Sequence, residues 1–194
     1  MGVIKTALEI ALERTEKVKS DKQGIDQFEV KKRGKKLANA FLDGDADIVN
    51  ELKKTQAQDR ENLKQGIFDV LVSQIALPSA GSDEKRIEKL GKGLSAVINN
   101  NEFNEMYKQL TMLFAQYLKE VSQCEQMLRQ QYAPKLRQKE EELSHRLGRE
   151  VRIDPFQDPE FANFYNQNMN ALKANYETVV DQAREEAKRM FNGK

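Results

Sequence analysis

The longest regular pattern of apolar and polar positions in this chain covers residues 102–147. Its apolar side chains recur at steps of three and four: Phe103, Met106, Leu110, Leu113, Tyr117, Val121, Cys124, Leu128, Leu136, Leu143 and Leu147. Such spacing keeps one face of a 3.6-residue helix apolar. At 1.5 Å per residue, that helix is roughly 65–70 Å long. Because a compact globule of this chain length is only about 40 Å across, the pattern predicts an elongated molecule.

Two residues affect the course of this helix: Pro134 inside it and Gly148 after it. Pro134 removes one backbone hydrogen bond and clashes with the preceding turn, but no glycine or good capping residue surrounds it. We therefore expect a kink more than a break at Pro134. Gly148 supplies the C-terminal stop, since glycine adopts the left-handed conformation that ends many helices.

A second long pattern begins after an extended connector at residues 149–158. Asp158 is a good N-cap, and Pro159 suits the first helical position. The apolar stripe that follows is heptad-like: Phe161, Phe164, Tyr165, Met169, Leu172, Tyr176, Val179, Ala183, Ala187 and Met190. We expect this helix to fold back along the long one as an antiparallel, coiled-coil-like hairpin.

The first hundred residues predict shorter helices. Their patterns cover residues 3–19, 26–42, 48–76 and 84–98. A polar stretch at 20–24 is predicted to separate the first two, and an aspartate-rich turn at 43–47 to end with a capping Asp47. Residues 63–77 are apolar nearly all round, which is typical of a helix in the middle of a core.

The predicted fold is therefore all-α, an elongated helical bundle of about six helices. Residues 1–121 form its core region and residues 122–194 a helical hairpin that packs back on it. Composition agrees, because helix formers dominate, tryptophan is absent and proline occurs four times. Hydrophobic residues make 39% and charged residues 32% of the chain, which suits an elongated helical protein with much surface.

Charge and cysteine content restrict the functional classes. The net charge of +1 gives no global field that would attract nucleic acid or a membrane. Cys124 is the single cysteine, which excludes an internal disulfide and suits a reducing compartment. No run of about eighteen apolar residues exists, so no membrane span is expected. We expect a cytoplasmic protein.

One candidate site is the basic run around a loop-like Gly34. Its five cations are Lys31, Lys32, Arg33, Lys35 and Lys36. They could bind phosphates, with the glycine allowing close backbone approach. Most charge runs are solvated helix faces, however, and no aromatic residue interleaves this one. A second basic set between residues 129 and 152 is diluted by glutamates. Nucleic-acid binding is therefore the alternative reading.

A second candidate, Glu142 with His145, has the Glu-x-x-His spacing of carboxylate di-iron bundles. Those sites need two such pairs, and His145 is the only histidine. Steps of 100° also place both side chains off the face that carries Leu143 and Leu147, so we expect a solvent-exposed histidine. No constellation meets the requirements of a reacting site. We expect no enzyme, no cofactor and no metal.

The third candidate is a row of amides beside the apolar stripe of the long helix. Gln109, Gln116, Gln123 and Gln130 recur every seven residues, and the final helix carries Asn163, Asn166, Gln167 and Asn170 similarly close to its own stripe. Uncharged amides tolerate partial burial better than charges do. They are predicted to line a contact with a third helix or with another protein chain. Glutamine is also a good helix former, so spacing alone leaves both explanations open.

The turn of the hairpin is a further candidate contact. Val151, Ile153, Pro155 and Phe156 place apolar residues where the connector is expected to form the tip. Exposed apolar residues at a tip favour a docking point for a partner.

Three segments carry a resemblance to a known family: residues 4–15 (IKTALEIALERT), 131–143 (QYAPKLRQKEEEL) and 154–161 (DPFQDPEF). They resemble a family of uncharacterised, all-helical bacterial proteins over most of the chain. The resemblance implies a bacterial, cytoplasmic source and brings no activity, cofactor or catalytic residue. The sequence thus predicts a non-enzymatic scaffold or adaptor that contacts a protein partner or forms a homodimer.

Overall fold

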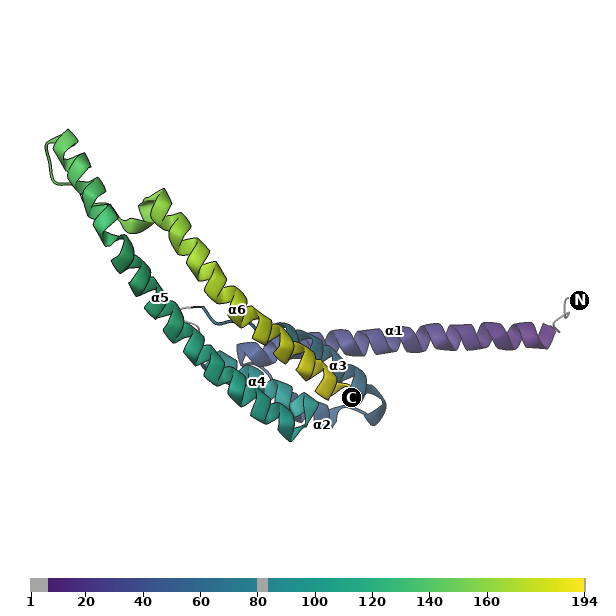
Figure 1. Cartoon of the computed structure of the whole chain (residues 1–194). Coiled ribbons are helices and arrows are strands. Elements are labelled where there is room, and N and C mark those ends of the chain that lie inside the picture. The colour runs from purple at the N-terminus through teal and green to yellow at the C-terminus, as the bar shows by residue number, and fades with distance from the viewer. Residues whose placement is uncertain (1–6, 80–83, 194) are drawn as a thin grey trace, which may run out of the picture. The chain divides into compact units, whose positions relative to one another are not determined.

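The computed structural model describes residues 7–79 and 84–193, with side chains from residue 24 onward (Figure 1). In those residues it has six α-helices, one short 3-10 helix and no strand, which confirms the all-α fold class. The chain forms two compact units. Unit 1 comprises Met1–Ile75, Glu84–Phe103 and Ala187–Lys194, and unit 2 comprises Ala76–Asp83 and Asn104–Glu186. The predicted boundary at residue 121 falls inside a helix and stays a prediction.

Unit 1 is built from four helices and the start of a fifth. They are α1 (Ala7–Asp43), α2 (Ile48–Lys54), α3 (Ala57–Ser73), α4 (Glu84–Ile98) and the first turn of α5 (Asn101–Leu147). Because α1 is continuous, the break predicted at residues 20–24 is wrong. A single helical glycine costs only about 1 kcal/mol relative to alanine, so Gly24 does not end the helix. The packing predicted for residues 3–19 concerns side chains outside the described residues.

One continuous helix was predicted over residues 48–76, but the structure has two helices there, α2 and α3. The predicted continuity is therefore wrong. Thr55 adopts an extended conformation with ψ 137°, which ends α2. Its hydroxyl donates to the backbone carbonyl of Glu51 at 2.7 Å, and its backbone N–H donates to the same carbonyl at 3.1 Å, so both cap the last turn of α2. Gln56 then occupies the N-cap of α3, which begins at Ala57.

The turn between α1 and α2 follows the prediction. Gly44 has φ +103°, a left-handed conformation that suits glycine at a helix end. The Asp47 carboxylate accepts from the backbone N–H of Asn50 at 3.1 Å and caps α2. The predicted turn with a capping aspartate is confirmed.

The core of unit 1 centres on α3, as the all-round apolar pattern predicted. Its buried side chains are Ala38, Ile48, Leu52, Leu63, Ile67, Phe68, Leu71, Val72, Ile75, Leu90, Leu94, Val97 and Phe103. Phe68 also stacks on Phe191 from the end of the chain, with ring centroids 4.1 Å apart.

Two glycines set the crossing of α1 and α3. A Cβ on Gly66 would overlap the carbonyl oxygen of Lys31, and a Cβ on Gly34 would overlap that of Leu63. The two helix backbones are therefore in direct contact. This corrects the prediction of a loop-like Gly34: the residue is buried inside a helix, and its backbone faces α3 instead of solvent.

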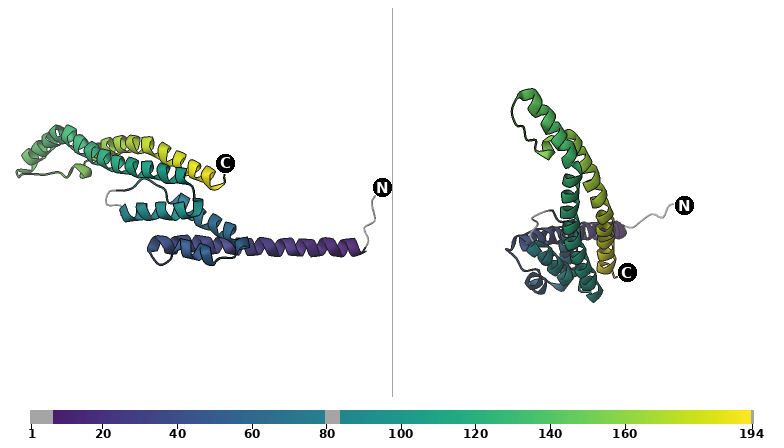
Figure 2. Two further views of the ribbon diagram at one scale, coloured as in Figure 1. Left: turned by 90° about the horizontal axis from the view of Figure 1, so that it is seen from below. Right: turned by 60° about the vertical axis from the view of Figure 1, so that its left-hand side comes forward.

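Unit 2 contains the predicted hairpin. Within it, α5 and α6 (Pro159–Phe191) lie side by side and antiparallel in all views (Figures 1 and 2). With 47 residues, α5 is about 70 Å long. It is unbroken at Pro134, in line with the expectation of no break. Gly148, with φ +66°, ends it as predicted.

The seam of the hairpin is aromatic. Tyr117 packs against Tyr176 with centroids 5.0 Å apart, and Tyr132 packs against Phe161 at 5.2 Å. The buried seam residues are Leu110, Phe114, Tyr117, Leu128, Tyr132, Phe161, Tyr176, Val180 and Ala183.

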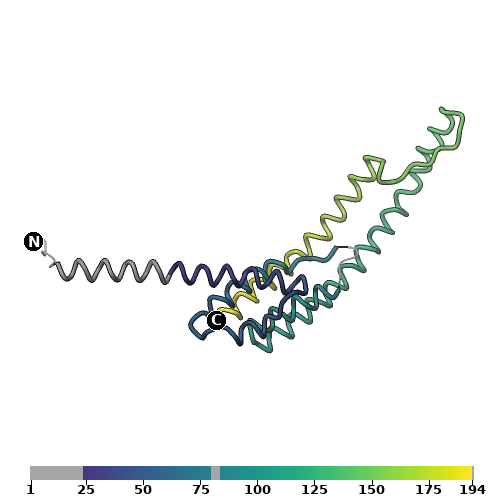
Figure 3. The backbone as a smooth tube through the Cα atoms, turned by 180° about the vertical axis from the view of Figure 1, so that it is seen from behind, coloured from purple at the N-terminus to yellow at the C-terminus, as the bar shows by residue number. Residues whose placement is uncertain are grey.

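The connector between α5 and α6 runs back along α5 (Figure 3). The backbone N–H of Val151 donates to Ser144 Oγ at 2.9 Å, and that of Ile153 donates to Glu140 Oε1 at 2.8 Å. The side chains of Val151 and Ile153 are half-buried. A short 3-10 helix, η1 (Pro155–Gln157), then leads into α6.

Candidate functional site

The four predicted glutamines are all exposed on α5. They belong to a longer row at alternating steps of three and four, which we call the amide stripe. It consists of Gln109, Met112, Gln116, Lys119, Gln123, Gln126 and Gln130, every one exposed. Only one of these residues is charged, in a chain with 32% charged residues. The stripe has the spacing of a helix-packing face without a partner in unit 2.

Two methionines make this face more apolar than its amides alone. Met112 is 62% exposed, and Met127, beside the stripe, is 48% exposed. Gln116 Nε2 donates to Glu120 Oε1 at 2.8 Å, which lowers the pKa of that carboxyl. Flexible methionines are common at protein-binding surfaces. The seven-residue spacing in the sequence indicated only the glutamines; the positions three residues after each of the first three are Met112, Lys119 and Gln126.

A groove of about 440 Å³ lies between α5 and α6 at one edge of the amide stripe. It is lined by Met106, Gln109, Leu110, Leu113, Val179, Gln182, Ala183 and Glu186. Gln109 belongs to both the groove and the stripe. The lining is mostly apolar, and among the described residues that form it Glu186 is the charged one. We call this feature the α5/α6 groove.

Phe156 does not lie at the end of the hairpin, where the sequence placed it. Its ring meets Phe161 and Tyr165 edge-on, with centroids 5.3 and 5.1 Å away. The guanidinium carbon of Arg129 lies 4.8 Å from the ring centroid. Leu147, 57% exposed, is the apolar residue at the end of α5. Docking through Val151, Ile153 and Phe156 stays a prediction, but the place of Phe156 in the hairpin is corrected.

An ionic network fastens the connector and the start of α6 to α5. Lys139 Nζ lies 2.6 Å from Asp158 Oδ2 and 2.5 Å from Glu160 Oε2, and it donates to the Tyr132 hydroxyl at 3.2 Å. Lys135 pairs with Glu160 Oε1 at 3.0 Å. Asp158 is buried and accepts from the backbone N–H of Glu160 at 2.9 Å, as its predicted capping role requires.

This network was not predicted from the sequence, where its two lysines belong to the basic set that glutamates dilute. Lys135 and Lys139 are one helical turn apart, but their acidic partners come from beyond the connector. Only the fold-back brings the two groups together. The network therefore stabilises the hairpin and takes both lysines out of any phosphate site.

We expect the network to make the hairpin sensitive to acid. Lys139, and then Lys135, lowers the pKa of Glu160 from 4.5 to about 2. A carboxyl with a lowered folded-state pKa contributes stability above its unfolded pKa and loses it as the pH falls through the folded value. The Glu160 contribution should therefore be complete above pH 4.5 and fade toward pH 2. Thermal melts of wild type and Glu160→Gln should show a Tm gap that closes over this range.

Glu141→Gln, at an exposed position of the same hairpin, is the matched control. Its Tm gap to wild type should stay small and constant over the same pH range. A gap for Glu160→Gln that does not change with pH would contradict the assigned role of the network.

The five cations of the basic run do not form one phosphate-binding cradle. Lys31 is half-buried at the crossing with α3, and Arg33 Nη2 lies 3.2 Å from Glu51 Oε2. Lys32, Lys35 and Lys36 are exposed on one broad side of α1, with Lys35 and Lys36 on either flank of Lys32. Phosphate binding by these residues stays a prediction, without the backbone approach expected at Gly34.

The last candidate pair from the sequence is Glu142 with His145. Glu142 and His145 are both exposed, as predicted. Among the residues that the structure describes, no three His, Cys, Asp or Glu side chains come together in a way that could hold a metal ion. Within the same residues, every helix is too short or too polar to cross a membrane.

The fold and its surface define an all-α protein with a long antiparallel helical hairpin and an exposed, amide-rich helix face. The chain belongs to a family of unknown function, DUF6657, whose sequence pattern matches residues 49–189. This confirms the resemblance to an uncharacterised family. The match covers α3, α4, α5 and all but the last two residues of α6. No curated protein and no solved structure matches the chain.

Proposed function

We propose that this protein is a non-enzymatic scaffold or adaptor that binds another protein chain through the amide stripe of α5, in the cytoplasm of a bacterium. The amide stripe is the observation that supports the proposal. Seven residues at helix-packing spacing are all exposed, and six of them are uncharged. A solvated helix face in a chain this rich in Glu and Lys would instead carry charges.

The chemistry of the stripe suits a helical partner. Amides can give and accept hydrogen bonds at a contact without the cost of burying a charge. Met112 and Met127 supply adaptable apolar surface. A partner helix with small, apolar and amide side chains at the same spacing would fit against this face as the third helix of a bundle.

Changing Gln116 and Gln123 together to glutamate should abolish the contact, because each carboxylate would have to be buried without a partner. Tagged wild type and the double variant are used to capture proteins from the source cell. Sedimentation velocity of the purified chains measures self-association. We expect the captured partner, or the self-associated species, to be lost in the double variant.

Gln131→Glu combined with Gln138→Glu is the matched control, because it makes the same two changes, seven residues apart, at exposed positions of α5 outside the amide stripe. The control variant should capture the same proteins as wild type and sediment like wild type. If the stripe variant and wild type capture the same proteins and sediment alike, the proposal is wrong. Capture of nucleic acid, lost at high salt, would favour the alternative reading.

A further inference from the structure

The amide stripe of α5 belongs to a longer row of positions that ends in opposite charges. The alternating steps of three and four continue from the stripe to Glu105 on one side and to Arg137 on the other. Both side chains are exposed, and the whole row lies in unit 2. No ion pair among the described residues involves either side chain. The row therefore offers a negative charge at one end and a positive charge at the other.

A second copy of α5, running antiparallel to the first, would pair both charges at once. A two-fold axis at the level of Val121 places residues that are equally far from Val121 opposite each other. Glu105 and Arg137 are each sixteen residues from it, so the Glu105 of each copy meets the Arg137 of the other. The two residues are about 48 Å apart along one helix, so they cannot pair within a chain.

The residues between the two ends also match in this register. The opposed pairs are Met112 with Gln130, Gln116 with Gln126, and Lys119 with Gln123. No like charges are opposed in these pairs, and the Lys119 ammonium can donate to the amide oxygen of Gln123. Gln116 uses one Nε2 hydrogen toward Glu120. Its second amide hydrogen and its carbonyl oxygen remain for the contact.

The edges of the row permit two helices to approach each other. Ala115 and Ser122 are exposed beside the stripe, and small side chains at a contact shorten the distance between helix axes. Glu120, on the opposite edge, is turned toward α6, where it is hydrogen-bonded to Tyr176. It therefore stays outside the opposed pairs.

Other registers lose the charge match. A shift by one heptad in either direction places Glu105 opposite Gln130 or opposite Ser144, both uncharged. A parallel pair of α5 helices in register would bring the two copies of Glu105 together and likewise the two copies of Arg137, which costs free energy. The antiparallel register about Val121 is thus the one that the charges favour.

We propose that two copies of this protein form a two-fold dimer in which their α5 helices pack antiparallel through the row from Glu105 to Arg137. Each copy presents the same surface to the other, so the assembly closes at two chains. The inference rests on the proposed function, because it uses the same amide stripe, and it names a second copy of the chain as the partner of that stripe.

Sedimentation equilibrium of the purified full chain at low salt, where exposed charges are screened least, tests the end pairs. Wild type should dimerise. Glu105→Arg and Arg137→Glu should each raise the dimer dissociation constant about tenfold, because each turns two attractive pairs into repulsive ones. Both changes in one chain should restore the wild-type constant. Glu142→Arg is the control, because it reverses the same charge at an exposed position of α5 outside the row.

Mixing the two single variants gives a second test. A dimer of one Glu105→Arg chain and one Arg137→Glu chain has a native pair at one end and a reversed pair at the other, and both pairs are attractive. The mixture should therefore associate more tightly than either variant alone. A contact that does not place these two residues opposite each other would show no such gain.

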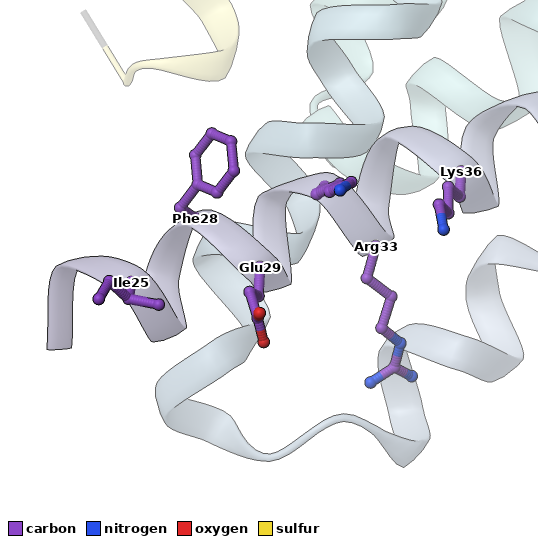
Figure 4. Close-up of a pocket in the computed structure, with 6 residues that line it drawn as sticks. Ile25, Phe28, Glu29, Arg33 and Lys36 are labelled. Atoms are coloured by element: carbon purple, nitrogen blue, oxygen red, sulfur yellow. The ribbon is translucent and has the colours of Figure 1, made fainter. Parts of the chain in front are cut away.

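A second exposed apolar surface, on α1, supplies a further control. Ile25 and Phe28 are 61% and 68% exposed, and they line a hollow of about 390 Å³ with four charged residues of the same helix (Figure 4). Phe28 was predicted to be an apolar contact of its helix, which is wrong. Because Phe28 lies in unit 1, outside the row, Phe28→Ser should leave the dimer dissociation constant unchanged.

Several results would overturn the inference. They are a monomeric wild type, an unchanged dimer in either charge variant, a double variant that stays dissociated, and a dimer that is lost in Phe28→Ser. Far-UV circular dichroism of each variant checks that the helices are intact. A monomeric wild type would leave the proposed function standing, because capture of a different protein through Gln116 and Gln123 does not require self-association.

Discussion

Gly66→Ala should lower the free energy of unfolding by about 2–3 kcal/mol. The new Cβ would overlap the backbone carbonyl oxygen of Lys31 in α1. A backbone atom inside a helix cannot turn aside as the end of a flexible side chain can, so α1 and α3 must separate. Separation loosens the surrounding core, including Leu63 and Ile67, which are fully buried. Urea denaturation followed by far-UV circular dichroism measures the loss.

Gly24→Ala is the matched control for this prediction. It makes the same substitution in a helix, but its Cβ meets no atom within 4 Å. Alanine has the higher helix propensity, so this variant should be more stable than wild type by about 0.5–1 kcal/mol. If Gly66→Ala and Gly24→Ala changed the free energy of unfolding equally, the crossing of α1 and α3 would not be tight.

Phe161→Ala should destabilise the hairpin by about 3–5 kcal/mol, the usual cost of removing a buried aromatic ring. Phe161 is fully buried at the start of α6. Its ring lies 5.2 Å from Tyr132, 5.3 Å from Phe156 and 6.0 Å from Tyr165, so alanine leaves a cavity among three other rings. All five tyrosines of the chain lie between residues 107 and 176, and tryptophan is absent. Guanidinium denaturation followed by the near-UV tyrosine signal therefore reports on unit 2 alone.

Phe156→Ala is the control for Phe161→Ala. Its ring joins the same cluster but is 43% exposed. It should cost about 1 kcal/mol, which is the scale of an aromatic pair beyond simple burial. A loss for Phe161→Ala no larger than this would mean that the aromatic cluster does not hold the hairpin.

Apolar periodicity predicted most of the helices correctly, because a buried helix face must repeat near 3.6 residues whatever it packs on. It identified the long helix α5, the central helix α3 and the hairpin seam. Helix ends were harder to predict, because they depend on small differences in free energy at single residues. Gly24 was too weak a breaker to end α1. The stop at Thr55 uses a hydroxyl bonded to the carbonyl of Glu51, which propensity does not reveal.

The candidate surface was predicted in part. The seven-residue spacing of Gln109, Gln116, Gln123 and Gln130 pointed to one helix face, and the structure shows that this face is exposed. The groove beside it was not predictable, because its other wall belongs to α6. The exposure of Ile25 and Phe28 was also hidden, since an apolar residue on a helix looks the same in sequence whether or not a neighbour covers it.

By itself, the sequence determined that this chain is helical, where most of its helices run, and that its last helix folds back on the long one. These features follow from backbone periodicity and local capping, which act over a few residues. Only the tertiary structure decided that Gly34 and Gly66 bring two backbones into contact, and that Lys139 meets Asp158 and Glu160. It likewise decided which apolar side chains stay exposed. Each of these depends on pairs of residues far apart in the chain, whose meeting is set by how the helices pack.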